Sequence, residues 1–114
     1  MDSVIPVGQG LPSWVDTSVY LSADETRELP DADCGDAAVC SRCFGRPMWT
    51  EKAHVARKQM GGRKKAGPTV RLCQACHTEI DQHPETMTMA VGRRDHAIVL
   101  LTRDGTEQVI GRVP

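Results

Sequence analysis

The sequence predicts a small α+β domain that cysteine side chains help to hold together. The 114-residue chain carries two Cys-x-x-Cys pairs, Cys40 with Cys43 and Cys73 with Cys76, and the second pair opens a segment with helical composition. A run of apolar residues over 97–101 is typical of a strand. The chain has only four aromatic residues, so its apolar core is expected to be thin and a metal crosslink would be physically useful.

The first expected element is a short helix within an acidic N-terminal extension, residues 1–38. Ser22 and Glu25 have the spacing of a capping box, in which each side chain bonds the backbone N–H of the other residue. Pro30 stops this helix, because a proline disfavours helical backbone in the residue before it. Ahead of the helix, residues 15–21 have the composition of a short strand.

The central block, residues 39–84, is expected to form two extended segments and then a helix. An extended segment over 48–57 carries His54, and the glycine pair 61–62 interrupts the pattern. A basic loop follows, and weak alternation over 69–72 indicates a second strand. The helix then begins at the second cysteine pair and ends before a proline.

The C-terminal part, residues 85–114, is expected to add a short helical turn and a β-hairpin that packs on the central block. The helical turn is predicted over 85–95, and the strands over 97–101 and 108–113. An Asp-Gly step at 104–105 provides the turn between the strands.

The N-terminal sequence has neither the basic start nor the apolar stretch of an export signal, and no run approaches the ~20 apolar residues that span a bilayer. We therefore expect a cytoplasmic protein with no membrane partner. In that reducing compartment, paired cysteines act as metal ligands more often than as disulfides.

The net charge of −1 conceals a strong asymmetry along the chain. Residues 1–39, including an acidic linker over 30–39, hold eight acidic residues and one basic residue. Residues 40–77 hold nine basic residues and one acidic residue, whereas residues 78–114 hold six acidic and four basic residues. A local excess of positive charge of this size favours a nucleic-acid partner.

The two Cys-x-x-Cys pairs have the spacing of a structural zinc site. Two thiolates three positions apart can turn onto one ion, and two such turns complete a tetrahedron with no open position. A redox Cys-x-x-Cys or two buried thiol pairs are the alternatives. The fifth cysteine, Cys34, lies in the acidic linker and is expected to be a free thiol.

Two histidines, His54 and His77, lie in or beside the segment that the cysteine pairs enclose. Fixed by the metal, they would present two imidazoles in a basic setting. A neutral imidazole can take a proton from water, and a hard divalent cation can stabilise the charge that develops on a phosphate. These are the groups that phosphodiester hydrolysis needs.

The central block resembles the HNH endonucleases of the ββα-metal class. The resemblance runs through Cys-Ser-Arg-Cys at 40–43, Ala-His-Val at 53–55, Gly-Gly at 61–62 and Leu-Cys-Gln-Ala-Cys-His at 72–77. It covers about residues 40–83 and is closest to the small phage-type members with a zinc-bound CxxC…CxxCH pattern. The fold that the resemblance implies is a ββα-metal core with structural zinc.

The resemblance implies hydrolysis of DNA with Mg²⁺ or another divalent cation in a bacterial cell, by a protein that a phage or another mobile element encodes. It implies that His54 is the general base and that His77 binds the catalytic cation. A second ligand one helical turn after His77 falls on Asp81. Residue 53, usually an aspartate or histidine ligand in the family, is Ala53, and the chain has no asparagine for the middle position of the motif.

These departures keep a second hypothesis open, a non-catalytic zinc-stabilised module that binds DNA. A zinc-stabilised protein-interaction domain is a third hypothesis, which leaves the histidines and the basic loop unexplained.

The expected oligomeric state is a monomer or a homodimer. Phosphate contacts are expected from six basic residues: Arg57, Lys58, Arg63, Lys64, Lys65 and Arg71. No aromatic residue lies between Trp49 and the end of the basic loop, so base stacking is not expected to drive affinity.

Overall fold

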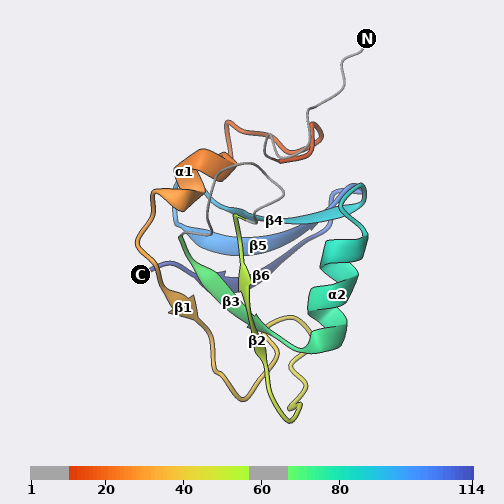
Figure 1. Ribbon diagram of the computed structural model, residues 1–114. Helices are drawn as coiled ribbons and strands as arrows, with labels where there is room; N and C mark the ends of the chain where they lie inside the picture. Colours follow the sequence, from red (N-terminus) through yellow and green to blue (C-terminus); the bar gives the residue numbers. More distant parts are fainter. Residues whose placement is uncertain (1–10, 57–66) are drawn as a thin grey trace.

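A computed structural model of the chain describes residues 11–56 and 67–114 (Figure 1). This part of the chain forms a small α+β fold with two three-stranded sheets. In chain order the elements are α1 (Ala23–Arg27), β1 (Asp33–Cys34), β2 (Glu51–His54), β3 (Thr69–Leu72), α2 (Gln74–Gln82), β4 (Met87–Val91), β5 (Ala97–Thr102) and β6 (Glu107–Arg112).

The first sheet has the order β1-β3-β2, with β3 in the centre. β2 pairs with β3 antiparallel, which places His54 opposite Thr69 and Ala53 opposite Val70. The two-residue strand β1 pairs with β3 in parallel. The sequence predicts a linker over 30–39. The pairing shows instead that Asp33 and Cys34 belong to the sheet.

The second sheet is an antiparallel meander with the order β4-β5-β6. β5 and β6 form the predicted C-terminal hairpin, with a bulge between Ile98 and Val99. The prediction of a helical turn over 85–95 was wrong, because Met87–Val91 is the strand β4 and pairs with β5 along its whole length. The C-terminal part is therefore a three-stranded sheet.

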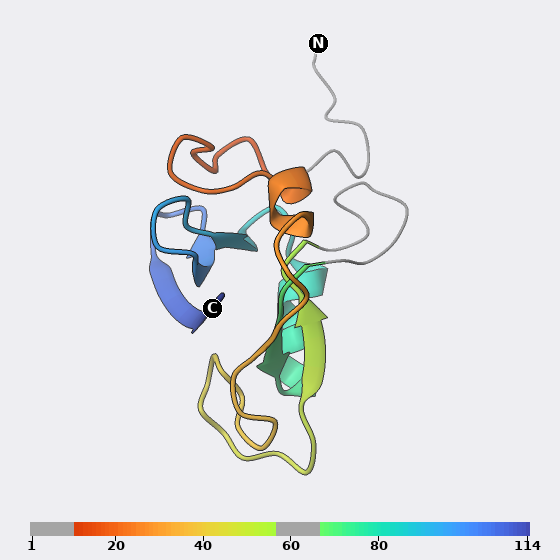
Figure 2. The ribbon, with the colours of Figure 1, turned by 90° about the vertical axis from the view of Figure 1, so that its left-hand side faces the viewer.

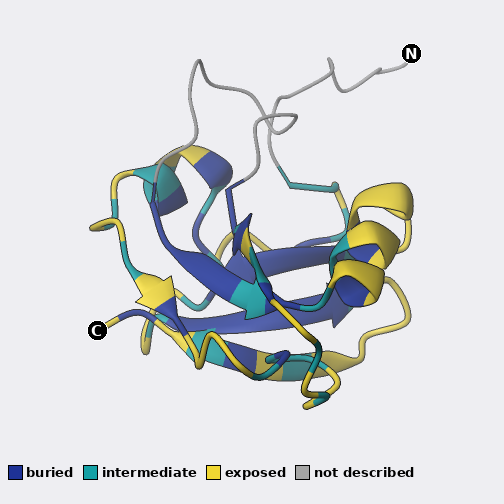
Figure 3. Cartoon of the chain, turned by 60° about the horizontal axis from the view of Figure 1, so that its bottom comes forward, coloured by how far each residue is buried: buried dark blue, intermediate teal, exposed yellow. Residues whose placement is uncertain are grey.

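The two sheets pack against each other with α2 beside them (Figures 1 and 2). Buried side chains from both sheets meet in one cluster, in which Val70 and Leu72 of β3 join Ile98 and Leu100 of β5. α2 contributes Ile80 to the same cluster, whereas its outer side is exposed to solvent (Figure 3). A second, smaller cluster covers the other face of the second sheet with side chains from the N-terminal segment.

The N-terminal segment is attached to the second sheet by α1 and the residues that precede it. The capping box is confirmed, since Ser22 and Glu25 bond each other's backbone N–H reciprocally. Glu25 also accepts hydrogen bonds from Arg93, and these bonds together with those from Ser22 lower the pKa of Glu25 to about 2. The strand predicted over 15–21 is reduced to a single bridge between Tyr20 and Gly92.

Within the described residues, no helix is both long enough and apolar enough to cross a membrane.

Candidate metal centre and histidine cluster

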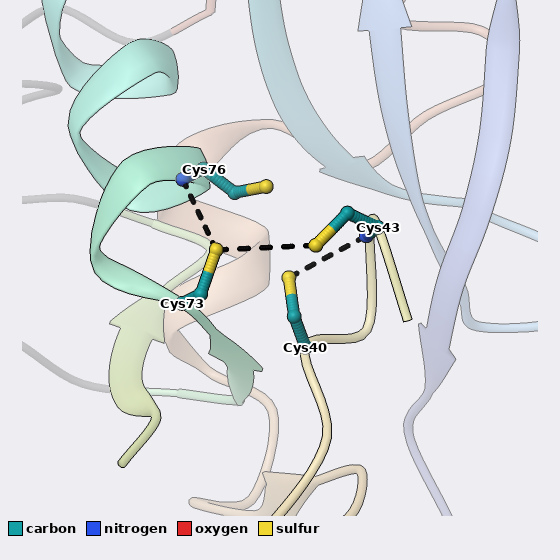
Figure 4. A group of neighbouring side chains, drawn as sticks. All are labelled: Cys40, Cys43, Cys73 and Cys76. Atoms are coloured by element: carbon teal, nitrogen blue, oxygen red, sulfur yellow. Dashed lines mark hydrogen bonds between the residues drawn. The ribbon is translucent and has the colours of Figure 1, made fainter. Parts of the chain in front are cut away.

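The four paired cysteines converge at one point in the fold (Figure 4). Their sulfur atoms all lie within 4.8 Å of one another, and the Sγ atoms of Cys43 and Cys73 are 4.0 Å apart. Four sulfurs around one zinc ion at about 2.3 Å stand roughly 3.8 Å apart, so the observed spacing fits such a site. All four are free thiols rather than disulfides. The cluster could therefore hold a metal ion, and its donor set is the one that zinc prefers.

Each cysteine pair forms a tight turn in which a backbone amide points at the first sulfur. The N–H of Cys43 donates to Cys40 Sγ and that of Cys76 donates to Cys73 Sγ, both at 3.5 Å. The first turn continues through Phe44, whose φ of 61° lies in the left-handed region. That conformation costs a residue with a side chain roughly 1–2 kcal/mol. The turn is therefore held by its surroundings rather than by local preference.

Hydrogen bonds connect the first cysteine turn to three elements of the fold. The Ser41 N–H donates to the carbonyl of Arg71 on β3 at 2.8 Å. Arg42 forms an ion pair with Glu79 on α2 at 2.7 Å, and its carbonyl accepts from Gln108 on β6 at 2.8 Å. The turn that carries two of the four sulfurs is thus anchored to both sheets and to the helix.

The surroundings of Cys40 favour the ionised sulfur that a metal requires. Burial raises the pKa of the Cys40 thiol, but the amides of Cys43, Cys73 and Arg42 donate to the sulfur and lower the pKa overall, to about 6. Burial raises the pKa of Cys76, and hydrogen bonds to the neighbouring cysteines add to this shift. Of these two buried cysteines, Cys40 is therefore the one whose sulfur ionises more readily.

His77 lies between two carboxylates on neighbouring elements. Its Nδ1 is 2.7 Å from Oε1 of Glu51 on β2, and its Nε2 is 3.4 Å from Oδ2 of Asp81 one turn later on α2. The helix register produces the second contact, because residues four apart share a helix face. The strand register produces the first, since Glu51 lies opposite Leu72, just before the helix. The structure thus brings the predicted pair His77 and Asp81 together.

His54 lies on the other face of β2. Successive residues of a strand point to opposite faces, so Glu51 and Ala53 share one face, and Lys52 and His54 share the other. Ala53 is fully buried, in the cluster between the sheets. His54 stands three residues beyond Glu51, roughly 10 Å along the strand. The two histidines therefore do not form a single cluster, and their roles stay predictions.

The six basic residues expected to bind DNA divide into two groups. Five of them (Arg57, Lys58, Arg63, Lys64 and Lys65) lie outside the described residues, as do Gly61 and Gly62. The sixth, Arg71, forms hydrogen bonds through Nε and Nη2 to the carboxylate of Asp33, the shortest 2.6 Å long. This ion pair joins β1 to β3, so the guanidinium of Arg71 already has an anionic partner within the fold.

Glu51, His77 and Asp81 together form the histidine cluster, and Glu51 is the member that the sequence did not single out. It is the one acidic residue among residues 40–77, and it precedes Ala53 by two positions, which places both on the same face of β2. These two facts could have singled it out. Its contact with His77, however, depends on the strand register, which the sequence does not state.

A surface cleft of about 570 Å³ lies elsewhere, over the second sheet, where Tyr20, Arg93 and Glu107 line it. It includes none of the cysteines or histidines discussed above.

Comparison of the chain with protein-family models, with curated proteins and with solved structures gives no match.

Proposed function

We propose that this protein is a metal-dependent DNA endonuclease of the HNH type, with a structural zinc ion in the four-cysteine site. The observation that carries the proposal is the position of His77 between Glu51 and Asp81, on a helix whose N-cap and first turn carry two of the cysteines. The order β2, β3, α2, with β2 and β3 antiparallel, agrees with the strand-strand-helix succession that the sequence resemblance implies. The excess of basic residues over 40–77 fits a DNA substrate.

In this proposal the catalytic cation binds Nε2 of His77 and a carboxylate oxygen of Asp81. These two atoms lie 3.4 Å apart, a separation at which both would reach one divalent cation. With its proton on Nδ1, His77 donates to Glu51, which would fix the ring and leave the Nε2 lone pair facing Asp81. A carboxylate behind a ligating histidine is the usual arrangement at metal sites.

His54 is the proposed general base. Its neutral imidazole accepts a proton from the attacking water while the water oxygen bonds to phosphorus and the bond to the leaving oxygen breaks. A bound divalent cation supplies stabilisation of the charge that develops on the phosphate.

The proposal predicts that the zinc-loaded protein nicks supercoiled plasmid when Mg²⁺, Mn²⁺ or Ni²⁺ is added. His54→Ala is expected to reduce the nicking rate about 10²- to 10⁴-fold, the usual contribution of a general base. His83→Ala is the matched control, because His83 is an exposed histidine at the end of α2 that takes no part in the proposed mechanism. Equal nicking by wild-type and His54→Ala preparations would point to a contaminating nuclease and would contradict the proposal.

Replacing Glu51 tests the orienting role separately. Glu51→Ala is expected to raise the cation concentration needed for half-maximal nicking roughly 10- to 100-fold, because the ligating ring loses its supporting carboxylate. His54→Ala should instead lower the rate at every cation concentration. A cation titration of both variants distinguishes the two effects, and an unchanged midpoint for Glu51→Ala would remove Glu51 from the site.

One observation favours a second candidate, a DNA-binding module without catalysis. Ala53 offers no ligand atom at the position where the resembled family carries one, and its side chain is completely buried. The same plasmid experiment separates the candidates. Retarded plasmid without nicking at any cation concentration would favour the binding module.

A further inference from the structure

The segment that joins the first cysteine turn to β2 displays large apolar side chains to solvent. Phe44, Met48 and Trp49 are 69%, 96% and 57% exposed, and they account for three of the five large exposed apolar residues in the described chain. Figures 1 and 2 place this yellow segment at one end of the molecule, beyond the ends of the first sheet's strands. We name Phe44, Met48 and Trp49 the knuckle patch.

The backbone at Phe44 indicates that its ring is present for a reason other than folding. The turn requires a positive φ at this position, and glycine meets that requirement without strain. The Phe44 side chain is mostly exposed, so it contributes little burial in return. Strained backbone conformations that burial of the side chain does not offset occur preferentially at functional sites.

The charges around the knuckle patch determine what kind of partner it suits. Arg46 and Lys52, on either side of the exposed tryptophan, are both exposed. The acidic residue closest to them in the sequence, Glu51, is bonded to His77. Aromatic rings that alternate with exposed cations match the two chemical parts of a single-stranded nucleic acid, its base faces and its phosphates.

We propose that the knuckle patch binds unpaired bases of DNA, with Phe44 and Trp49 as stacking platforms and Arg46 and Lys52 as phosphate contacts. Lys52 and His54 share one face of β2, so a strand bound at the patch and at Lys52 is directed along β2 towards His54. The inference deepens the proposed function, since it names DNA with unpaired bases as the substrate class. It differs from the expectation that base stacking does not drive affinity, which considered only the loop after Trp49.

The experiment measures binding of the full-length, zinc-loaded protein to a fluorescent single-stranded oligodeoxynucleotide by anisotropy. It uses the His54→Ala background without added divalent cation, so failure of the nuclease proposal does not affect the result. Phe44→Gly and Trp49→Ala are each expected to weaken binding roughly 5- to 150-fold, the range for loss of one stacked base. Val109→Ala, another exposed apolar residue on β6, is the matched control and should leave affinity unchanged.

Two further probes separate stacking from charge. An oligonucleotide of abasic sites keeps the phosphates, so wild-type and Phe44→Gly proteins should bind it equally, and Phe44→Tyr should restore binding to the normal oligonucleotide. Phe44→Gly should melt at the same temperature as the parent or higher, because glycine removes the backbone strain. Unchanged affinity in both patch variants would overturn the inference, and so would an equal loss on the abasic probe.

Discussion

Removal of the metal is expected to abolish the cooperative unfolding transition of this protein. Structural zinc contributes roughly 10–16 kcal/mol to small metal-dependent peptides, whereas a whole domain is stable by only about 5–15 kcal/mol. The four sulfurs connect a turn between β1 and β2 to the start of α2, so loss of the ion leaves the turn attached to α2 by polar contacts such as the partly exposed Arg42–Glu79 ion pair, which contribute little. Cys40→Ser should have the same effect as a strong chelator.

Zinc content by mass spectrometry and thermal unfolding by circular dichroism test this expectation together. Cys34→Ala is the matched control, because Cys34 is also a buried free thiol but is not one of the four clustered cysteines. It should retain one zinc ion per chain and a cooperative transition. A protein that contains no zinc and still unfolds cooperatively would refute the structural role. A melting temperature that chelation leaves unchanged would refute it as well.

Ile80→Ala is expected to destabilise the protein by about 2–5 kcal/mol, which is the usual cost of truncating a buried isoleucine. α2 has two buried residues, of which Cys76 belongs to the metal site and Ile80 is fully enclosed between the sheets. A helix of nine residues is marginal in isolation. Ile80 is therefore the apolar contact that holds the second half of α2.

At about 4 °C per kcal/mol for a chain of this size, the melting temperature should fall by roughly 8–20 °C. The matched control is Thr78→Ala on the same helix, where an exposed residue changes and the melting temperature should stay within about 2 °C. If Ile80→Ala behaved like Thr78→Ala, the packing of α2 against the sheets would have to be different in solution.

Elements with strong local signals were predictable from the sequence. The helix after the second cysteine pair begins and ends close to its predicted limits, with Cys73 as its N-cap. The capping box at Ser22 and the hairpin of β5 and β6 have the same origin, since each depends on residues within a few positions of one another. Such signals act before the chain makes any distant contact.

The missed strands depend on distant contacts. β4 is buried on both faces along most of its length, because the first sheet covers one side and residues near Val15 cover the other. It therefore lacks the apolar and polar alternation that identifies a strand. β1 has only two residues and exists because β3 pairs with it, so no local pattern could have predicted it.

The same contrast holds within the site. The spacing within each pair was enough to predict the four-cysteine site, because each pair forms a local turn and two such turns suit one common ion. The position of Glu51 beside His77 required the register of β2 on β3, and the pairing of Arg71 with Asp33 required β1. The predictions that rest on spacing within each cysteine pair agree with the structure. The side-chain partners that lie on different strands could not be predicted, because they depend on how the strands pair.

The strand order of the first sheet bears on how these molecules behave in a concentrated solution. An open sheet has two edge strands whose free backbone groups can recruit strands from other chains and so start aggregation. Here β1 is too short to serve as a template, and β2 carries the exposed charge of Lys52. The edge that contains β2 can thus face a negatively charged polymer, while charge repulsion opposes pairing with a second copy of the chain.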